Sequence, residues 1–333
     1  MHVGRRYPLI AIIRWTQVET LIFVGLALVP QILRALDLPV PKIPWPPVAL
    51  IGTLVAFITG FKGNAAYDRL WEARQLWGGI VNTSRTWAVM AMDFFTPNTL
   101  PATHALSRRL VFRHLAWLTA LRYQLREPRS WENMREVQNR AYLKSAPAAI
   151  ERKTDIAKEL EKYLTAEECA AVLATKNRAV QIIALQSHEL STLAERGVLS
   201  EFRHIELMRT LSKLYEHEGG CERIKAFPYP RQFATLNLMF VWLFIGILPF
   251  AVTTELATIE LAVWWLEAPI TVAVAWVFHT MDKVGGLSEN PFEGGANDVP
   301  ITEMSRTIEI DLRELIGESN VPDPLKPVND ILL

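Results

Sequence analysis

Two rows of residues repeat at a spacing of four between positions 52 and 61. The first row consists of small residues, Gly52, Ala56 and Gly60. The second row carries a hydroxyl and two aromatic rings, on Thr53, Phe57 and Phe61. Residues four apart share one helix face, and small residues let helix backbones approach closely in lipid. If several copies surround an axis, the second row forms a narrow apolar throat that can gate by dewetting. The spacing alone favours ordinary packing of the rings against other helices.

These rows lie in a stretch that predicts one helix beginning in lipid and ending in water. The stretch 44–77, PWPPVALIGTLVAFITGFKGNAAYDRLWEARQLW, joins an apolar run directly to a charged, Trp-rich run. The apolar run, 46–61, is short for a membrane span of about 20 residues. We therefore expect the helix to continue past Phe61.

The charged part of this helix places acids and bases within one turn of each other. Arg69 can bond to Glu72, three positions on, whereas Asp68 and Glu72 repel each other at a spacing of four. We interpret the group as a buried cytoplasmic junction whose charges are neutralised by neighbouring segments. Direct contact of these side chains with an ion is the disfavoured alternative.

Composition divides the chain between membrane and water. Of its 333 residues, 50% are hydrophobic and 11 are Trp, which is too apolar for a typical soluble domain of this size. Yet 21% are charged, too many for a protein lying wholly in lipid. Basic and acidic residues balance at 35 each, so no basic surface suggests nucleic acid. The two cysteines, Cys169 and Cys221, argue against a disulfide framework and fit a reducing compartment.

Four apolar segments predict four transmembrane helices, at 15–36, 46–61, 233–252 and 261–281. Basic residues precede the first segment and fill the part between the second and third, while the link TTELATIE has none. The positive-inside rule then places both termini and the long middle part in the cytoplasm. No small-residue cleavage site follows the first segment, so we expect it to be retained. The prediction is a multi-pass protein of the inner (plasma) membrane.

Helical periodicity dominates, and the expected fold class is an all-α membrane protein. Four parts are expected. Residues 1–61 contain the first two membrane spans, and residues 62–231 form a cytoplasmic helical domain. Residues 232–282 contain the third and fourth spans, and residues 283–333 form a C-terminal cytoplasmic segment. Within the cytoplasmic domain, helical patterns cover 167–175, 180–193 and 201–216, and breaks are expected at 97–101, 145–147, 196–197 and 219–220. Thr302 is the expected N-cap of a last helix.

Enzyme signatures are missing from the sequence. It has no Walker loop, GxGxxG, HExxH or GxSxG motif. Glu201 and His204 have the spacing of half a di-iron site, but the motif occurs once, so we expect no metal, cofactor or enzyme activity. Glu267 lies within the fourth apolar segment. It is either a functional charge in the membrane or an interfacial residue beside Trp264 and Trp265.

Three stretches together resemble the prokaryotic bestrophins: 60–85 GFKGNAAYDRLWEARQLWGGIVNTSR, 219–224 GGCERI and 289–309 ENPFEGGANDVPITEMSRTIE. The resemblance covers nearly the whole chain in order. It implies a homopentameric ion channel, in which each subunit gives four membrane helices and a large cytoplasmic helical body. The C-terminal segment is then expected to wrap the assembly.

The resemblance also implies where the pore is narrow. In this family a triad on the second helix, at a spacing of four, lines a neck, and it falls here on Thr53, Phe57 and Phe61. Thr53 stands where the family usually has a branched aliphatic residue, so that ring is expected to be wider and wetter. A second, cytoplasmic constriction is expected in the run NRAVQIIALQS, at Ile182, with the adjacent Ile183 as the alternative.

The animal members of the family that this chain resembles are calcium-gated anion channels, with an acidic clasp after an NPF motif. That motif is present at 290–292, but the acids that should follow it are replaced by EGGAND, which leaves the carboxylates of Glu293 and Asp298. Calcium takes six to eight oxygen ligands. We therefore expect no high-affinity calcium switch at this loop.

The leading hypothesis is a pentameric channel that conducts small monovalent ions passively, without chemical turnover. Its partners would be further copies of the chain and the lipid bilayer. The choice between anions and cations stays open, because the neck row carries no charge. The alternative is a membrane-anchored helical interaction or regulatory protein without a pore. Oligomeric state separates the two hypotheses, because a pore on this row needs several copies around one axis.

Overall fold

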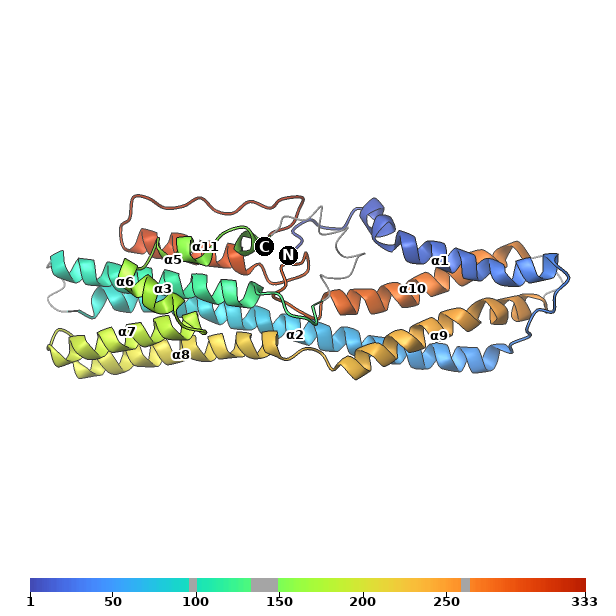
Figure 1. Cartoon of the computed structure of the whole chain (residues 1–333), viewed down its shortest axis with the longest axis horizontal. Helices are drawn as coiled ribbons and strands as arrows, with labels where there is room; N and C mark the ends of the chain where they lie inside the picture. Colours follow the sequence, from blue (N-terminus) through green and yellow to red (C-terminus); the bar gives the residue numbers. More distant parts are fainter. Residues whose placement is uncertain (96–100, 133–148, 259–263) are drawn as a thin grey trace.

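The computed structural model describes residues 1–95, 101–132, 149–258 and 264–333. Over these residues the molecule is elongated and consists of two helical halves laid end to end (Figure 1). The described part forms helices and no strand beyond two isolated β-bridges, one between His2 and Ile331 and one between Val328 and Ile331. The all-helical prediction is confirmed for these residues.

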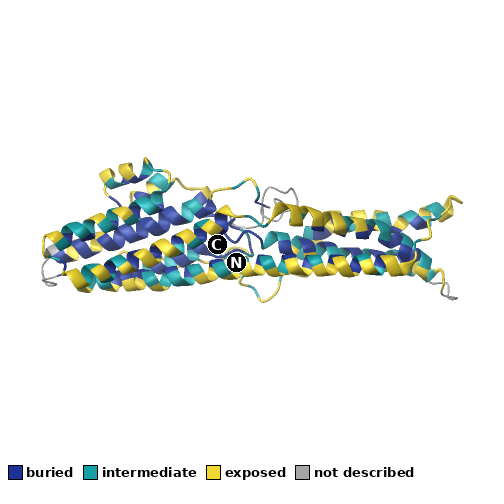
Figure 2. Ribbon diagram, turned by 90° about the horizontal axis from the view of Figure 1, so that it is seen from below, coloured by how far each residue is buried: buried dark blue, intermediate teal, exposed yellow. Residues whose placement is uncertain are grey.

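One half is a bundle of four helices packed side by side: α1 (Leu9–Ala35), the first part of α2 (Trp45–Asp93), α9 (Arg231–Leu256) and α10 (Glu267–Leu287) (Figure 1). By length and composition, α1, α2 and α9 can each cross a membrane. The fourth predicted span corresponds to α10, which packs against the other three helices. Its first predicted residues, 261–263, lie outside the described residues. Apolar side chains from all four helices form the core, including Phe23, Val55, Phe244 and Ala275, and the outer sides of the helices are exposed (Figure 2).

Helix α2 is continuous over 49 residues and belongs to both halves. It starts after Pro44 with prolines in its first turn, where the missing N–H groups have no helical partner to lose. The predicted continuation past Phe61 is confirmed and extends to Asp93. At about 1.5 Å per residue, this helix forms the long axis of the molecule.

In the other half, α3 (Pro101–Arg126), α8 (Glu201–Ala226) and α11 (Ile301–Leu315) pack against the second part of α2, and α7 (Arg178–Glu195) packs against α3 and α8. Short helices η2 (Ile150–Arg152), α5 (Ile156–Leu160) and α6 (Ala166–Leu173) cover α3 and α7. The three helical patterns predicted between 167 and 216 are therefore confirmed, as is the break at 196–197, where Gly197 has φ of 72°. The breaks predicted at 97–101 and 145–147 lie wholly or largely outside the described residues.

The break predicted at Gly219 and Gly220 is wrong, because α8 runs straight through both residues. A Cβ atom on Gly220 would lie 2.8 Å from Cδ2 of Leu76 on α2. The missing side chain lets α8 approach α2 closely, which outweighs the weak helical propensity of glycine.

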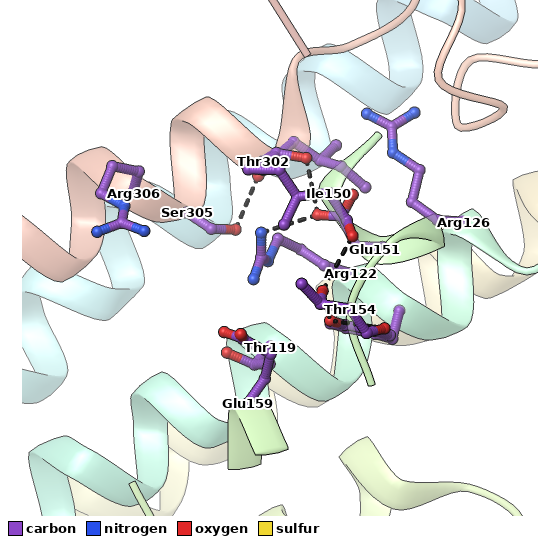
Figure 3. A network of polar contacts seen from close by, with 12 residues as sticks. Thr119, Arg122, Arg126, Ile150, Glu151, Thr154, Glu159, Thr302, Ser305 and Arg306 are labelled. Carbon is purple, nitrogen blue, oxygen red and sulfur yellow. Dashed lines mark hydrogen bonds and ion pairs between the residues drawn. The ribbon is translucent and has the colours of Figure 1, made fainter. Parts of the chain in front are cut away.

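The N-cap predicted at Thr302 is also wrong, because α11 already begins at Ile301 behind Pro300. The Thr302 hydroxyl instead donates to Oε1 of Glu151, at 2.7 Å. The same carboxylate oxygen accepts from Nη1 of Arg122 at 2.8 Å (Figure 3). The hydroxyl thus joins α11 to α3 and η2.

The C-terminal tail folds back along its own chain after α11 (Figure 1). The amide of Val3 donates to the carbonyl of Asp330, and the amide of Leu332 donates to the carbonyl of Met1, each at 2.8 Å. Both termini consequently lie together near the boundary between the two halves (Figure 1).

Candidate functional site

The predicted neck row lies on the exposed face of α2. Phe57 is 63% exposed and Phe61 57% exposed, and Thr53 is exposed as well. The opposite face of the helix is packed, with Val55 only 2% exposed. A Cβ atom on Gly52 would lie 2.8 Å from the Phe244 ring, so this small residue already serves packing within the chain.

Within one chain, the row presents apolar rings and no charge. The Phe57 and Phe61 rings meet edge to face, with centroids 4.5 Å apart and an interplanar angle of 83°. The Thr53 hydroxyl donates to the Ala49 carbonyl at 2.9 Å, so its proton is used inside the helix. These side chains can repel water, but they offer no fixed charge to an ion.

The same face continues below the row into the other half of the molecule. At 100° per residue, Asn64, Asp68, Trp71 and Gln75 lie within about 40° of the direction of Phe57, and all four are exposed. Among the described residues, Asp68 has no hydrogen bond or ion pair. Within the described part of one chain no neighbouring segment neutralises it, because the side chain points away from the packed face.

Arg69 and Glu72 are held by neighbouring segments, as predicted, but they are not bonded to each other. The Arg69 guanidinium donates to three carbonyls, those of Glu289 at 2.9 Å, Phe227 at 2.7 Å and Ile224 at 3.0 Å. Glu72 pairs with Arg223 on α8. The predicted bond between Arg69 and Glu72 is wrong, because carbonyls at the end of α8 and after α10 occupy the guanidinium.

A buried polar cluster ties α2, α9 and α10 together one residue beyond the row. Lys62 Nζ lies 2.6 Å from Asp282 Oδ1, and both side chains are less than 10% exposed. Asn237 Nδ2 donates to the same oxygen at 2.6 Å, and Thr59 donates to Asn237 Oδ1 at 3.2 Å. The sequence interpretation missed this cluster, although an ionisable residue directly after an apolar run, such as Lys62, was an available signal.

Two further ion pairs bind α1 to α10, one toward each end. Near the boundary between the halves, Lys283 Nζ lies 2.7 Å from Glu19 Oε1. At the far end, Glu267 pairs with Arg34 and accepts from the Thr253 hydroxyl at 3.0 Å. Glu267 is buried beside the exposed Trp264 and Trp265, so it has the predicted interfacial neighbours and also joins three helices.

The loop after α10 is buried, and the carboxylates of Glu293 and Asp298 in it are occupied. Asp298 Oδ2 accepts from the amides of Gly294 at 2.6 Å and Gly295 at 2.8 Å, and Glu293 Oε1 accepts from Asn290 Nδ2 at 2.6 Å. Gly294 has φ of 88°, which this turn requires. Burial raises the pKa of Asp298, and the nearby Arg126 guanidinium opposes that shift. The described residues contain no group of three or more His, Cys, Asp or Glu that could hold a metal.

The two residues of the predicted cytoplasmic constriction differ in burial. Ile182 is fully buried in the core between α3, α7 and α8. Ile183 packs against the same core but keeps part of its surface. A side chain that is fully buried within its own chain cannot line a pore on an axis shared by several copies. The constriction stays a prediction, and burial favours Ile183 for it.

Comparison with known families decides the relationship of the chain. A family model described as Bacterial/Fungal Bestrophin protein matches residues 9–314. The chain belongs to the bestrophin family. The resemblance of its three sequence motifs to the prokaryotic bestrophins is therefore confirmed.

Its relatives within the bestrophin family are similar along most of their length. YneE of Escherichia coli strain K12, called a voltage-dependent anion channel-forming protein, is 28% identical over 281 residues, which cover 84% of this chain and 80% of the relative. A protein of the same description from Ralstonia nicotianae is 28% identical over 277 residues, with 83% and 79% covered. The crystal structure of a bacterial bestrophin homologue from Klebsiella pneumoniae superposes with a TM-score of 0.73 at 27% identity, covering 93% of this chain and 99% of that one.

Proposed function

We propose that the chain forms a homopentameric channel of the inner (plasma) membrane that conducts small monovalent ions passively, without chemical turnover. Family membership, the channel-forming description of its relatives and three helices able to cross a membrane support this function. The neck of the pore is formed by Thr53, Phe57 and Phe61 from each copy. Ions enter or leave it through a wider cytoplasmic vestibule.

The observation that carries the proposal is the position of Phe57 at the centre of an exposed helix face. Large apolar rings on an unpacked face need either lipid or another copy of the chain to cover them. Ala56 and Gly60, beside the row, are exposed too, and a Cβ atom on Gly60 would meet no atom within 4 Å. Small residues at this place allow α2 helices of neighbouring copies to approach closely. The aromatic row then faces the shared axis and forms an apolar neck that gates by dewetting.

The remaining parts follow the same arrangement. The parts 62–231 and 283–333 lie in the cytoplasm with both termini, and the C-terminal segment also contacts neighbouring copies. A second narrowing lies at the cytoplasmic end, on Ile183 with Ile182 behind it. The sign of the permeant ion is set outside the uncharged neck row.

Ion flux through proteoliposomes tests this function. The variant Phe57→Ala/Phe61→Ala removes both aromatic rings and so widens the neck. Ion flux is therefore expected to rise well above that of wild type. The matched control, Phe233→Ala/Phe240→Ala, removes two exposed rings from α9 and is expected to leave flux unchanged. Equal flux from all three folded proteins contradicts the neck. Absence of flux from all, or a monomer in mild detergent, supports the anchored interaction protein instead.

A further inference from the structure

A cavity of about 400 Å³ lies where α1, α10 and the loop after α10 meet. Its volume falls within the roughly 300–1,000 Å³ typical of small-molecule sites. The walls come from the start of α1 and the end of α10, and the loop 293–298 closes one end. The cavity does not touch the neck row, so it is separate from the proposed pore.

The walls are apolar over most of their area. Ala11 and Ile12 of α1 face Val284 and Leu287 of α10 across the cavity. Two indole rings complete the walls, at Trp15 and Trp276. The indole nitrogen of Trp276 already donates to the Thr16 hydroxyl at 3.0 Å, so this ring contributes apolar surface to the cavity wall.

The polar end of the cavity is closed by contacts within the chain. The Tyr7 hydroxyl donates to Asn297 Oδ1 at 2.9 Å and joins the start of the chain to the loop. The Asp298 carboxylate accepts the two glycine amides, and the Glu293 carboxylate accepts from Asn290. These acids are therefore occupied and do not make the end of the cavity a free cation site.

Three basic residues stand next in sequence to residues of the cavity wall on the α1 side. Arg5 and Arg6 directly precede Tyr7, and Arg14 directly precedes Trp15. All three are exposed, and within the described part of the chain they form no ion pair or hydrogen bond. Arginines at the cytoplasmic end of a membrane helix attract anionic lipid headgroups. Tyr and Trp beside them are typical of the membrane interface.

We propose that this cavity binds a membrane phospholipid, with one acyl chain between α1 and α10 and an anionic headgroup at Arg5, Arg6 and Arg14. Leu9, Ile10 and Ile13 on the same part of α1 are exposed and apolar, as expected of a helix segment that lies against lipid. The proposal requires the bundle to sit in a membrane, but it does not require a pore. It also means that the lipid stabilises the contact between α1 and the loop.

Native mass spectrometry of the full chain in mild detergent tests the site. The probes are phosphatidylglycerol, which is anionic, and phosphatidylcholine, which has no net charge and matched acyl chains. Wild type is expected to retain phosphatidylglycerol with a preference of about tenfold. Ala11→Trp fills the cavity and is expected to abolish retention, whereas Ala35→Trp, the same change at the exposed far end of α1, leaves it intact. Arg5→Gln/Arg6→Gln/Arg14→Gln is expected to remove the preference for the anionic lipid.

A second measurement keeps the test independent of folding of the variants. Phosphatidylglycerol with a photoreactive group on its acyl chain is expected to label wild-type peptides containing Trp15 or Trp276. Retention by Ala11→Trp at the wild-type level, or equal retention of both lipids by wild type, overturns the proposal. Labelling of other peptides alone overturns it too, as does a crosslink showing that a segment of a neighbouring copy fills the cavity.

Discussion

Breaking the buried ion pair between Lys62 and Asp282 is expected to destabilise the chain strongly. Lys62→Met leaves the Asp282 carboxylate buried with Asn237 as its remaining side-chain partner. Removing one partner of a buried pair costs about 3–5 kcal/mol. The double variant Lys62→Met/Asp282→Leu removes both charges and is expected to return to within about 1–3 kcal/mol of wild type. The remaining loss arises because Asn237 Nδ2 no longer has its acceptor.

Unfolding in mixed micelles of mild detergent and dodecyl sulfate, followed by far-ultraviolet circular dichroism, measures these free energies. The control is Arg209→Met, which breaks the pair between Arg209 and Glu206. Both of those side chains are about half exposed or more, so the loss is expected to stay below about 1 kcal/mol. The reasoning is refuted if Lys62→Met costs no more than this control. It is also refuted if the double variant is as unstable as the single one.

Three further outcomes are expected. Asp68→Asn removes an exposed carboxylate on the face of α2 below the neck, so the reversal potential in asymmetric NaCl should move toward that of the anion; an unchanged value removes Asp68 from the ion path. Burial raises the pKa of Glu218 to about 7, although Trp117 Nε1 donates to it at 2.7 Å. Because the folded state holds this proton more tightly, stability present below the ordinary pKa of 4.5 is lost as pH rises through about 7. In Glu218→Gln the melting temperature should depend less on pH across this window. A pH dependence of the melting temperature equal to that of wild type contradicts the assignment. Millimolar calcium should leave flux at the level seen with chelator, because the Glu293 and Asp298 carboxylates are occupied; activation by calcium points to a site completed by another copy.

The long α2 helix and its exposed row could be predicted because both depend on local spacing. Phe57 and Phe61 are one helical turn apart, and the apolar run passes into the charged run without a proline. Helical period fixes which residues share a face, whatever the rest of the chain does. Covering of that face by other copies is a property of the assembly, and the spacing of one chain does not specify it.

Prediction failed where contacts between distant segments decide the outcome. Two consecutive glycines, Gly219 and Gly220, are typical of the end of a helix. Here the close approach of α8 to Leu76 on α2 favours small residues instead. Asp68 and Arg69 are neighbours in sequence with opposite environments, because one points to solvent and the other to carbonyls of distant segments. No local pattern separates them.

The buried ion pairs were also beyond prediction from the sequence. Lys62 and Asp282 are 220 positions apart, and Arg34 and Glu267 are 233 apart. Taken alone, each of these charged residues looks like an ordinary residue at the end of a membrane span. Pairing depends on the relative height of the helices in the bundle, which hydropathy does not define to within one turn.

Cysteine modification at the row tests directly whether α2 lines an ion pathway. Phe57→Cys is placed in a chain carrying Cys169→Ala and Cys221→Ala, which removes the two native thiols, both buried. A charged, water-soluble thiol reagent is then expected to change ion flux through Phe57→Cys within the time of one recording. Leu243→Cys, at an exposed position on α9, is the control and is expected to show no change. Modification that leaves flux through Phe57→Cys unchanged, with the thiol shown to react, contradicts a pore on this row.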